Sequence, residues 1–188
     1  IVGFDIDVVK AVAAKAGIEV KFVNTPWEGI FNALGQGDRD MVVSAVTITD
    51  ERRQTMDFST PYFDAVQLIA VKDGSKVAKF DDLKKLKVGV QTGTTGDEAV
   101  TKLLGKTSTA IKRFESTPLA LKELEAGGRD AVAADNGAAI TTRHGSPAVR
   151  PLPGRVRARD RRRADLLTLA RMDRALALPA PAKVNLFL

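Results

Sequence analysis

An arginine stands just past a short apolar run, in a position where α/β proteins often hold ligands. Met41-Val42-Val43 predicts a buried strand, and the loop 44–53 that follows it carries small hydroxyl residues and Arg52. In open α/β sheets, ligands lie outside the carboxyl ends of the strands. The planar guanidinium of arginine matches a carboxylate with two parallel hydrogen bonds. We therefore expect Arg52 to bind an acid group. A solvated surface arginine beside Asp50 and Glu51 is the alternative, and the local sequence alone favours it.

A second group of candidates lies in the loop Gln91-Thr92-Gly93-Thr94-Thr95-Gly96, directly before a predicted helix. Glycines and hydroxyls at a helix start leave backbone N–H groups directed at an anion, and the helix dipole adds to the attraction. The loop lacks the lysine of a nucleotide-binding P-loop. A plain capping loop, with Thr94 or Thr95 as the N-cap, explains the pattern equally well.

Two further side chains complete the set of candidates. Asp135 ends the apolar run 131–134 and could accept hydrogen bonds from an ammonium group, although capping a helix near Asn136 is the stronger local explanation. Trp27 could cover the side chain of a ligand. It also completes the apolar stripe of its own predicted helix, so core packing is the simpler interpretation.

The sequence offers no catalytic set. No cluster of metal ligands, no Ser/His/Asp combination and no paired carboxylates stand out, and the single histidine, His144, lies in an unusual carboxyl-terminal segment. We therefore expect no enzyme activity, no metal and no cofactor.

These candidates must be positioned by alternating helices and strands. The alternation predicts an α/β fold with a mostly parallel sheet that helices cover on both faces. The motif Leu-x-x-Gly-x-Arg-Asp occurs at 34–40 and again at 124–130, which indicates two similar lobes and aligns Ala45 with Asp135. The expected helices are 5–16, 26–34, 81–86, 97–104 and 117–126, and the expected strands are 18–22, 40–44, 65–71, 88–90, 109–114 and 130–134.

Composition separates the last quarter of the chain from the rest. The 188 residues are 44% hydrophobic and 28% charged, which is ordinary for a soluble globular protein, and there is no cysteine for a disulfide or a thiolate. Residues 141–188 carry 11 Lys+Arg against 3 Asp+Glu, with an arginine run at 155–163. A nucleic-acid-binding arm is conceivable, but this composition favours a disordered or foreign extension. We expect no nucleic-acid partner.

Six motifs occur in order along the first part of the chain. They are Gly3-Phe4-Asp5-Ile6-Asp7, Trp27-Glu28-Gly29-Ile30, the run 44–52, Asp57-Phe58-Ser59-x-Pro61-Tyr62-Phe63, Val88-Gly89-Val90-x-x-Gly93-Thr94-Thr95-Gly96 and Asp130-Ala131-Val132-x-Ala134-Asp135. Together they resemble the extracytoplasmic amino-acid-binding proteins of ABC importers, solute-binding protein family 3, and they cover residues 1 to about 140 in the order and spacing of that family.

The resemblance implies a two-lobed periplasmic-binding-protein type II fold, incomplete at both ends, with lobe 1 at 1–66, lobe 2 at 67–140 and the anomalous segment at 141–188. It implies a monomeric periplasmic protein that captures a free amino acid for the membrane subunits of an ABC importer. The matching positions give each candidate a role. Arg52 clamps the α-carboxylate with donors at Thr47 and Thr95, Ala45 contributes its backbone, Thr94 belongs to the same anion-binding loop, Asp135 holds the α-ammonium, and Trp27 packs on the ligand side chain.

Two other functions fit the same fold. A periplasmic dehydratase, resembling cyclohexadienyl dehydratase, would need an acid or base beyond Asp135. A sensor domain of a membrane receptor would need a signalling module elsewhere in the gene. The last ten residues, 179–188, separately resemble the opening strand of 4-diphosphocytidyl-methylerythritol kinase, without any of that enzyme's catalytic residues.

Overall fold

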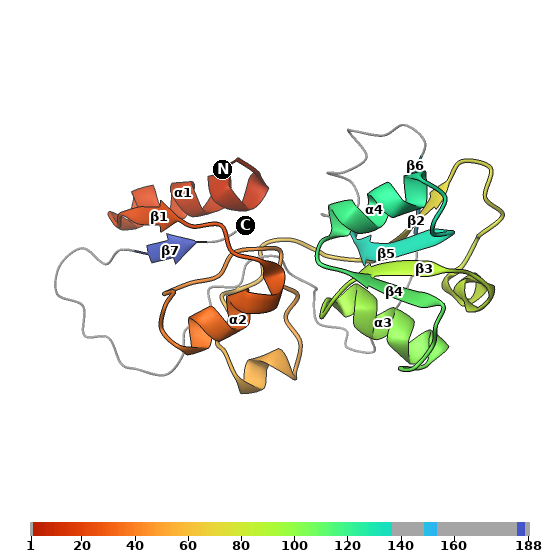
Figure 1. Cartoon of the computed structure of the whole chain (residues 1–188). Helices are drawn as coiled ribbons and strands as arrows, with labels where there is room; N and C mark the ends of the chain where they lie inside the picture. The colour runs from red at the N-terminus through yellow and green to blue at the C-terminus, as the bar shows by residue number, and fades with distance from the viewer. Residues whose placement is uncertain (1, 137–148, 154–183, 187–188) are drawn as a thin grey trace. The chain divides into compact units, whose positions relative to one another are not determined.

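A computed structural model of the chain describes residues 2–136, 149–153 and 184–186 (Figure 1). Contacts divide the chain into two compact units, one formed by Ile1–Asp64 with Arg163–Leu188 and the other by Ala65–Arg162. Of the segment 141–188, only two short strands are described, and His144 and the arginine run lie outside the described residues. No helix among the described residues is long and apolar enough to cross a membrane.

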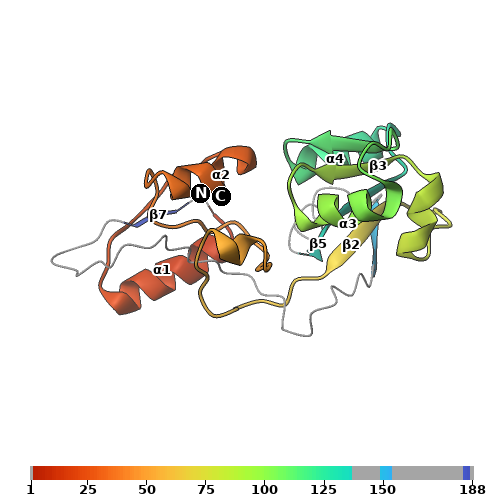
Figure 2. The same cartoon turned by 90° about the horizontal axis from the view of Figure 1, so that it is seen from below.

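The first unit is built on two helices and a short parallel strand pair. Helix α1 spans Phe4–Ala16 and ends at Gly17, whose left-handed φ of 67° lets its N–H bond back to Ala13. Strand β1 pairs in parallel with β7, with Val20 opposite Val184. In Figure 2, helices α1 and α2 lie on either side of β7. The other elements are β1 (Val20–Phe22), α2 (Trp27–Gly35), the 3-10 turn η1 (Arg52–Gln54) and β7 (Val184–Leu186).

The segment 41–43 lies in the core of this unit. Met41 and Val43 pack with Val9 of α1, whereas Val42 packs with the residues of α2. Such alternation between two sides is typical of a strand. The predicted strand 40–44 is nevertheless wrong, because no strand is assigned there among the described residues. A strand needs a hydrogen-bonded neighbour, and the described partner of β1 is β7.

The second unit contains a five-stranded sheet in the order β4-β3-β5-β2-β6. Strand β3 is parallel to β4 and to β5, while β2 is antiparallel to β5 and to β6. The expected mostly parallel sheet is therefore mixed: α3 and α4 act as the crossover connections of its parallel part, while β2 pairs antiparallel on both sides. The elements are β2 (Gln67–Lys72), η2 (Phe80–Lys85), β3 (Val88–Gln91), α3 (Thr95–Leu104), β4 (Ile111–Phe114), α4 (Thr117–Glu125), β5 (Ala131–Asp135) and β6 (Val149–Pro153).

Helices cover both faces of this sheet, as predicted. Successive strand residues point to opposite faces, so Ile69 packs in the cluster that includes Val100 of α3, and Ala70 packs with Leu124 of α4. Figure 1 shows α4 and α3 on opposite sides of the strands. The expected helix 81–86 is the 3-10 helix η2. The carboxyl ends of β3 and β5 carry the candidate residues of this unit.

Candidate functional site

Arg52 is anchored in the first unit by one backbone carbonyl and two aromatic rings. Its Nη1 donates a hydrogen bond to the carbonyl of Thr47 at 2.9 Å. The guanidinium carbon lies 5.8 Å from the ring centroid of Trp27 and 5.3 Å from that of Phe31. Positions four apart on a helix share a face, so the sequence of α2 itself brings the two rings together, edge to face at 5.2 Å.

This anchoring distinguishes Arg52 from its neighbour. Arg52 is half-buried, whereas Arg53 is exposed and lies over Phe58 at 5.8 Å. The backbone of the turn is also held, because Thr49 accepts the N–H of Arg52 on its hydroxyl at 3.2 Å and that of Arg53 on its carbonyl. A cation held over aromatic faces and by a carbonyl keeps one orientation. The guanidinium is therefore preorganised, as recognition of a planar anion requires.

Ala45 has an unusual backbone conformation that a buried carboxylate supports. Among the described residues, Ala45 is the only non-glycine residue with a positive φ, 49°, a conformation that costs about 1–2 kcal/mol. Its N–H donates to Oδ2 of Asp5 at 2.9 Å. The hydroxyl of Tyr62 donates to Oδ1 of the same carboxylate at 2.6 Å. One side chain of α1 thus joins the loop 44–53 to the segment 57–63.

Sequence reasoning missed this role of Asp5, which it used only as part of a motif. Asp5 is 8% exposed, and this burial raises its pKa, while the hydrogen bonds from Tyr62 and Ala45 act in the opposite direction. Burial and the neighbouring Asp5 carboxylate raise the pKa of Tyr62, so its phenol stays protonated and remains a donor. The contacts span 40 and 57 positions in sequence, which no local pattern reveals.

In the second unit, Thr94 is the N-cap of α3. Its hydroxyl accepts the N–H of Asp97 at 3.3 Å and donates to the carbonyl of Gln91 at 2.8 Å. The capping interpretation of this loop is therefore correct for Thr94. It does not exclude a ligand, because capping and anion binding use different groups of the same helix start.

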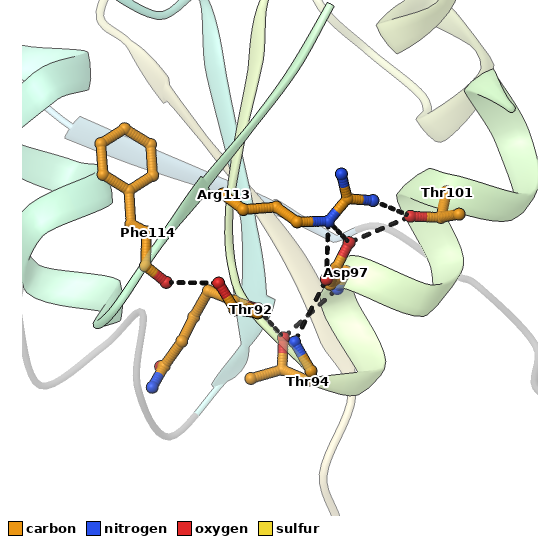
Figure 3. A network of polar contacts seen from close by, with 8 residues as sticks. Thr92, Thr94, Asp97, Thr101, Arg113 and Phe114 are labelled. Atoms are coloured by element: carbon orange, nitrogen blue, oxygen red, sulfur yellow. Dashed lines mark hydrogen bonds and ion pairs between the residues drawn. The ribbon is translucent and has the colours of Figure 1, made fainter. Parts of the chain in front are cut away.

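The loop 91–96 is held in place by a second carboxylate (Figure 3). Asp97 accepts the N–H of Gly93 at 3.1 Å and the hydroxyl of Thr101 at 3.0 Å. Nε of Arg113 lies 3.0 and 3.1 Å from its two oxygens, and Nη2 of Arg113 donates to Thr101 at 2.7 Å. The spacing Thr94-x-x-Asp97 is close to a capping box and is the sequence signal that could have revealed Asp97.

Gln67 connects the remaining two candidates. Its Nε2 donates to the hydroxyl of Thr95 at 2.9 Å, and its backbone lies opposite Asp135 in the antiparallel pair of β2 and β5. Gly96 makes this approach possible, since a Cβ there would lie 3.0 Å from the carbonyl of Ala133 and from Oε1 of Gln67. The start of α3 and the end of β5 therefore pack directly against each other.

The predicted site residues therefore form one group within each unit. Trp27 and Thr47 each lie against the guanidinium of Arg52, and Ala45 lies two positions before Thr47. Thr94, Thr95 and Asp135 lie around Gln67 and the first turn of α3. Within the described part of the chain, no group of three or more His, Cys, Asp or Glu could hold a metal ion.

Comparisons with known proteins identify the family of the chain. The sequence profile of bacterial extracellular solute-binding proteins, family 3, matches residues 1–176. The "Probable histidine-binding protein" of Neisseria gonorrhoeae is 52% identical over 135 residues, which are 71% of this chain and 50% of that protein. The L-arginine-binding protein of Pseudomonas aeruginosa is 33% identical over 135 residues, 71% of this chain and 52% of that protein. The chain thus spans about half the length of these curated relatives.

Solved structures show the same fold. The arginine-, lysine-, histidine-binding protein ArtJ of Geobacillus stearothermophilus superposes with a TM-score of 0.80 at 40% identity, covering 90% of this chain and 72% of that one. An ancestral arginine-binding protein bound to arginine gives a TM-score of 0.80 at 38% identity, with 90% and 74% covered. The expected α/β periplasmic-binding fold of type II is confirmed. The chain belongs to family 3 of the bacterial extracellular solute-binding proteins.

Proposed function

We propose that this protein is a non-catalytic receptor that captures a free amino acid outside the cytoplasm and delivers it to an ABC importer. The observation that carries the proposal is the preorganised guanidinium of Arg52, held by Thr47 and over the rings of Trp27 and Phe31. The named relatives are amino-acid-binding proteins, which supports this function over a dehydratase or a sensor domain.

Each candidate residue then has a role toward the ligand. In the first unit, Arg52 binds the α-carboxylate with the help of Thr47 and the backbone of Ala45, and Trp27 covers the ligand side chain. In the second unit, Thr94 and Thr95 present donors to the carboxylate, and Asp135 accepts hydrogen bonds from the α-ammonium. Opposite charges thus meet at each end of the amino acid.

Histidine is the first ligand to test, and arginine the second. The relative with 52% identity is named for histidine, and the solved neighbour with 40% identity is named for arginine, lysine and histidine. Trp27, the residue proposed to cover the ligand side chain, is aromatic, and aromatic rings pack well on an imidazole or a guanidinium.

Calorimetric titration of the full chain with histidine, arginine, lysine and glutamine tests the proposal. We expect heat of binding for at least one basic amino acid. Arg52→Ala should weaken that binding by about 2–5 kcal/mol, at least about 30-fold in Kd, because the carboxylate loses its charged partner. Arg53→Ala is the matched control, since Arg53 is the exposed neighbour.

Two results would contradict the proposal. One is the absence of heat for every amino acid with the folded chain. The other is an equal loss of affinity for Arg52→Ala and Arg53→Ala, because this would assign the loss to net charge. For the importer, the expected result is ligand-dependent stimulation of ATP hydrolysis by the reconstituted membrane subunits, with the receptor eluting as a monomer.

A further inference from the structure

We infer that Asp5 is a positioning residue for Arg52: by accepting the N–H of Ala45, it fixes the loop 44–53 and thereby sets ligand affinity without touching the ligand. The inference rests on the proposed function and adds a residue that the motifs did not assign to the site. Three observations lead to it: where the carboxylate lies, how Ala45 is strained, and how the loop carries Arg52.

The Asp5 carboxylate is built into the first unit as a fixed acceptor. It lies in the first turn of α1, where the helix dipole favours negative charge. Each of its oxygens accepts one hydrogen bond, from Ala45 N–H at 2.9 Å and from Tyr62 hydroxyl at 2.6 Å. Because Asp5 is only 8% exposed, water competes little for these bonds.

The loop needs this acceptor because of the conformation of Ala45. Val43, two positions before Ala45, and Val46, directly after it, are each at 0% exposure, so buried side chains hold the chain on both sides of the left-handed alanine. Loss of the acceptor for this half-buried N–H is therefore unfavourable. Without Asp5, both the strain and the lost hydrogen bond favour a return of Ala45 to a negative φ.

A change at Ala45 reaches Arg52 through a short path. Thr47, two residues further on, holds Nη1 of Arg52 on its carbonyl at 2.9 Å. Rotation of the backbone at Ala45 reorients that carbonyl, and the guanidinium then loses its fixed position over the rings of α2. Binding of the ligand carboxylate would then have to fix the conformation of the Arg52 side chain, and the entropy lost in this ordering lowers affinity.

The type of acceptor gives the inference a sharp test. The Ala45 N–H can only donate, whereas the Tyr62 hydroxyl can either donate or accept. Asn at position 5 can therefore direct its carbonyl to Ala45 and its NH2 to the Tyr62 oxygen. Asp5→Asn should keep Kd within about threefold of wild type, while Asp5→Ala should raise Kd about tenfold or more, as expected for one lost hydrogen bond and a freed loop.

Two control variants separate positioning from general damage. Asp7→Ala removes an exposed carboxylate from the same first turn of α1, so it reproduces the change in charge. Ile6→Ala removes a side chain that is 1% exposed, so it lowers stability without touching the Asp5 contacts. Under conditions where each variant is folded, both should keep Kd within about twofold of wild type, because neither alters the loop.

A second readout needs no ligand. Trp27 is the only tryptophan of the chain and lies 5.8 Å from the guanidinium carbon of Arg52. Its emission in the ligand-free full chain should therefore change in Asp5→Ala and stay as in wild type in Asp5→Asn, Asp7→Ala and Ile6→Ala. This readout tests the positioning of Arg52 even if no amino acid binds, a result that would overturn the proposed function alone.

The inference is supported if Asp5→Ala alone changes both Kd and Trp27 emission. It is overturned if Asp5→Ala leaves the Trp27 emission unchanged, if it leaves Kd unchanged for an amino acid that binds the wild type, or if Ile6→Ala weakens binding as much. Equal losses in Asp5→Asn and Asp5→Ala also overturn it, because they would mean that the negative charge, and not the acceptor for Ala45, controls the loop.

Discussion

Replacement of Asp97 by alanine should destabilise the second unit by about 3 kcal/mol. Asp97 accepts hydrogen bonds from two neutral donors, Gly93 N–H and the hydroxyl of Thr101, each contributing about 1 kcal/mol. The side chain of its third partner, Arg113, is 35% exposed, so this ion pair resembles a surface pair and contributes about 1 kcal/mol. The sum of these contacts is the lower end of the expected loss, because the helix dipole also favours a carboxylate in this turn.

Urea denaturation followed by far-UV circular dichroism measures this loss, because the only tryptophan lies in the other unit. Hydrogen exchange of the Gly93 amide gives a local measurement, and it should accelerate in Asp97→Ala. Glu98→Ala is the matched control. It removes the other acidic residue of the same helical turn, which does not take part in the bond from Gly93 to Asp97, so exchange of the Gly93 amide should stay as in wild type.

A double-mutant cycle with Arg113→Ala separates the contribution of the ion pair from that of the hydrogen bonds with Gly93 and Thr101. We expect a coupling free energy of about 1 kcal/mol between Asp97 and Arg113, with most of the loss remaining in the Arg113→Ala background. A total loss below about 1 kcal/mol in Asp97→Ala, or unchanged exchange of the Gly93 amide, would refute the view that Asp97 holds the loop 91–96.

Two further changes have expected outcomes. Gly96→Ala should cost about 1–3 kcal/mol of stability in urea denaturation, because its Cβ would overpack against Ala133 and Gln67. Gly29→Ala is the control, since a Cβ there would lie 3.9 Å from its nearest neighbour. It should be neutral or stabilising by up to about 1 kcal/mol in the same measurement. Burial raises the pKa of Asp5 from its ordinary value of 3.8, so the folded state binds this proton more tightly than the unfolded state does. The stability that this adds is present below pH 3.8 and is lost as pH rises through the raised pKa of the folded state. Wild type should therefore lose stability relative to Asp5→Asn from pH 3 to 7 in denaturation followed by Trp27 emission; a relative gain would contradict this sign.

Local periodicity predicted the helices well. The apolar spacing placed α1 and α2 within one residue at each end, and it placed α4 at Thr117–Glu125 against an expected 117–126. For α3 it missed the first two residues, Thr95 and Gly96, because small polar residues at a helix start carry no apolar period. Elsewhere, apolar residues three and four positions apart indicate a helix directly, because they lie on the same helical face.

The local sequence does not reveal which strands pair or in which direction they run. The run 41–43 has the buried alternation of a strand, yet a strand also depends on which segment lies beside it. The same limit applies to β2, whose sequence gives no sign that it runs antiparallel to β5. Pairing partners are far apart in the chain, so the apolar pattern fixes which face is buried and leaves the neighbour and its direction open.

The candidate residues could be predicted from their residue types and their places in the sequence. The side chains that hold them in position could not. Arg52 and Thr94 were visible because an arginine after a strand and a threonine before a helix have recognisable chemistry. The contacts of Asp5 with Ala45 and Tyr62 join distant segments, and Arg113 lies 16 residues from Asp97. Such contacts exist only once the fold has formed.

The two units nevertheless hold their candidate loops in the same way. In each, a carboxylate from the first turn of a helix accepts a backbone N–H of the loop: Asp5 of α1 bonds Ala45, and Asp97 of α3 bonds Gly93. The internal repeat does not explain this, since its offset of 90 residues would align Asp5 with Thr95 and Ala45 with Asp135. A physical explanation suffices, because a helix start stabilises a buried carboxylate and a bent loop needs an acceptor for the N–H that it turns inward.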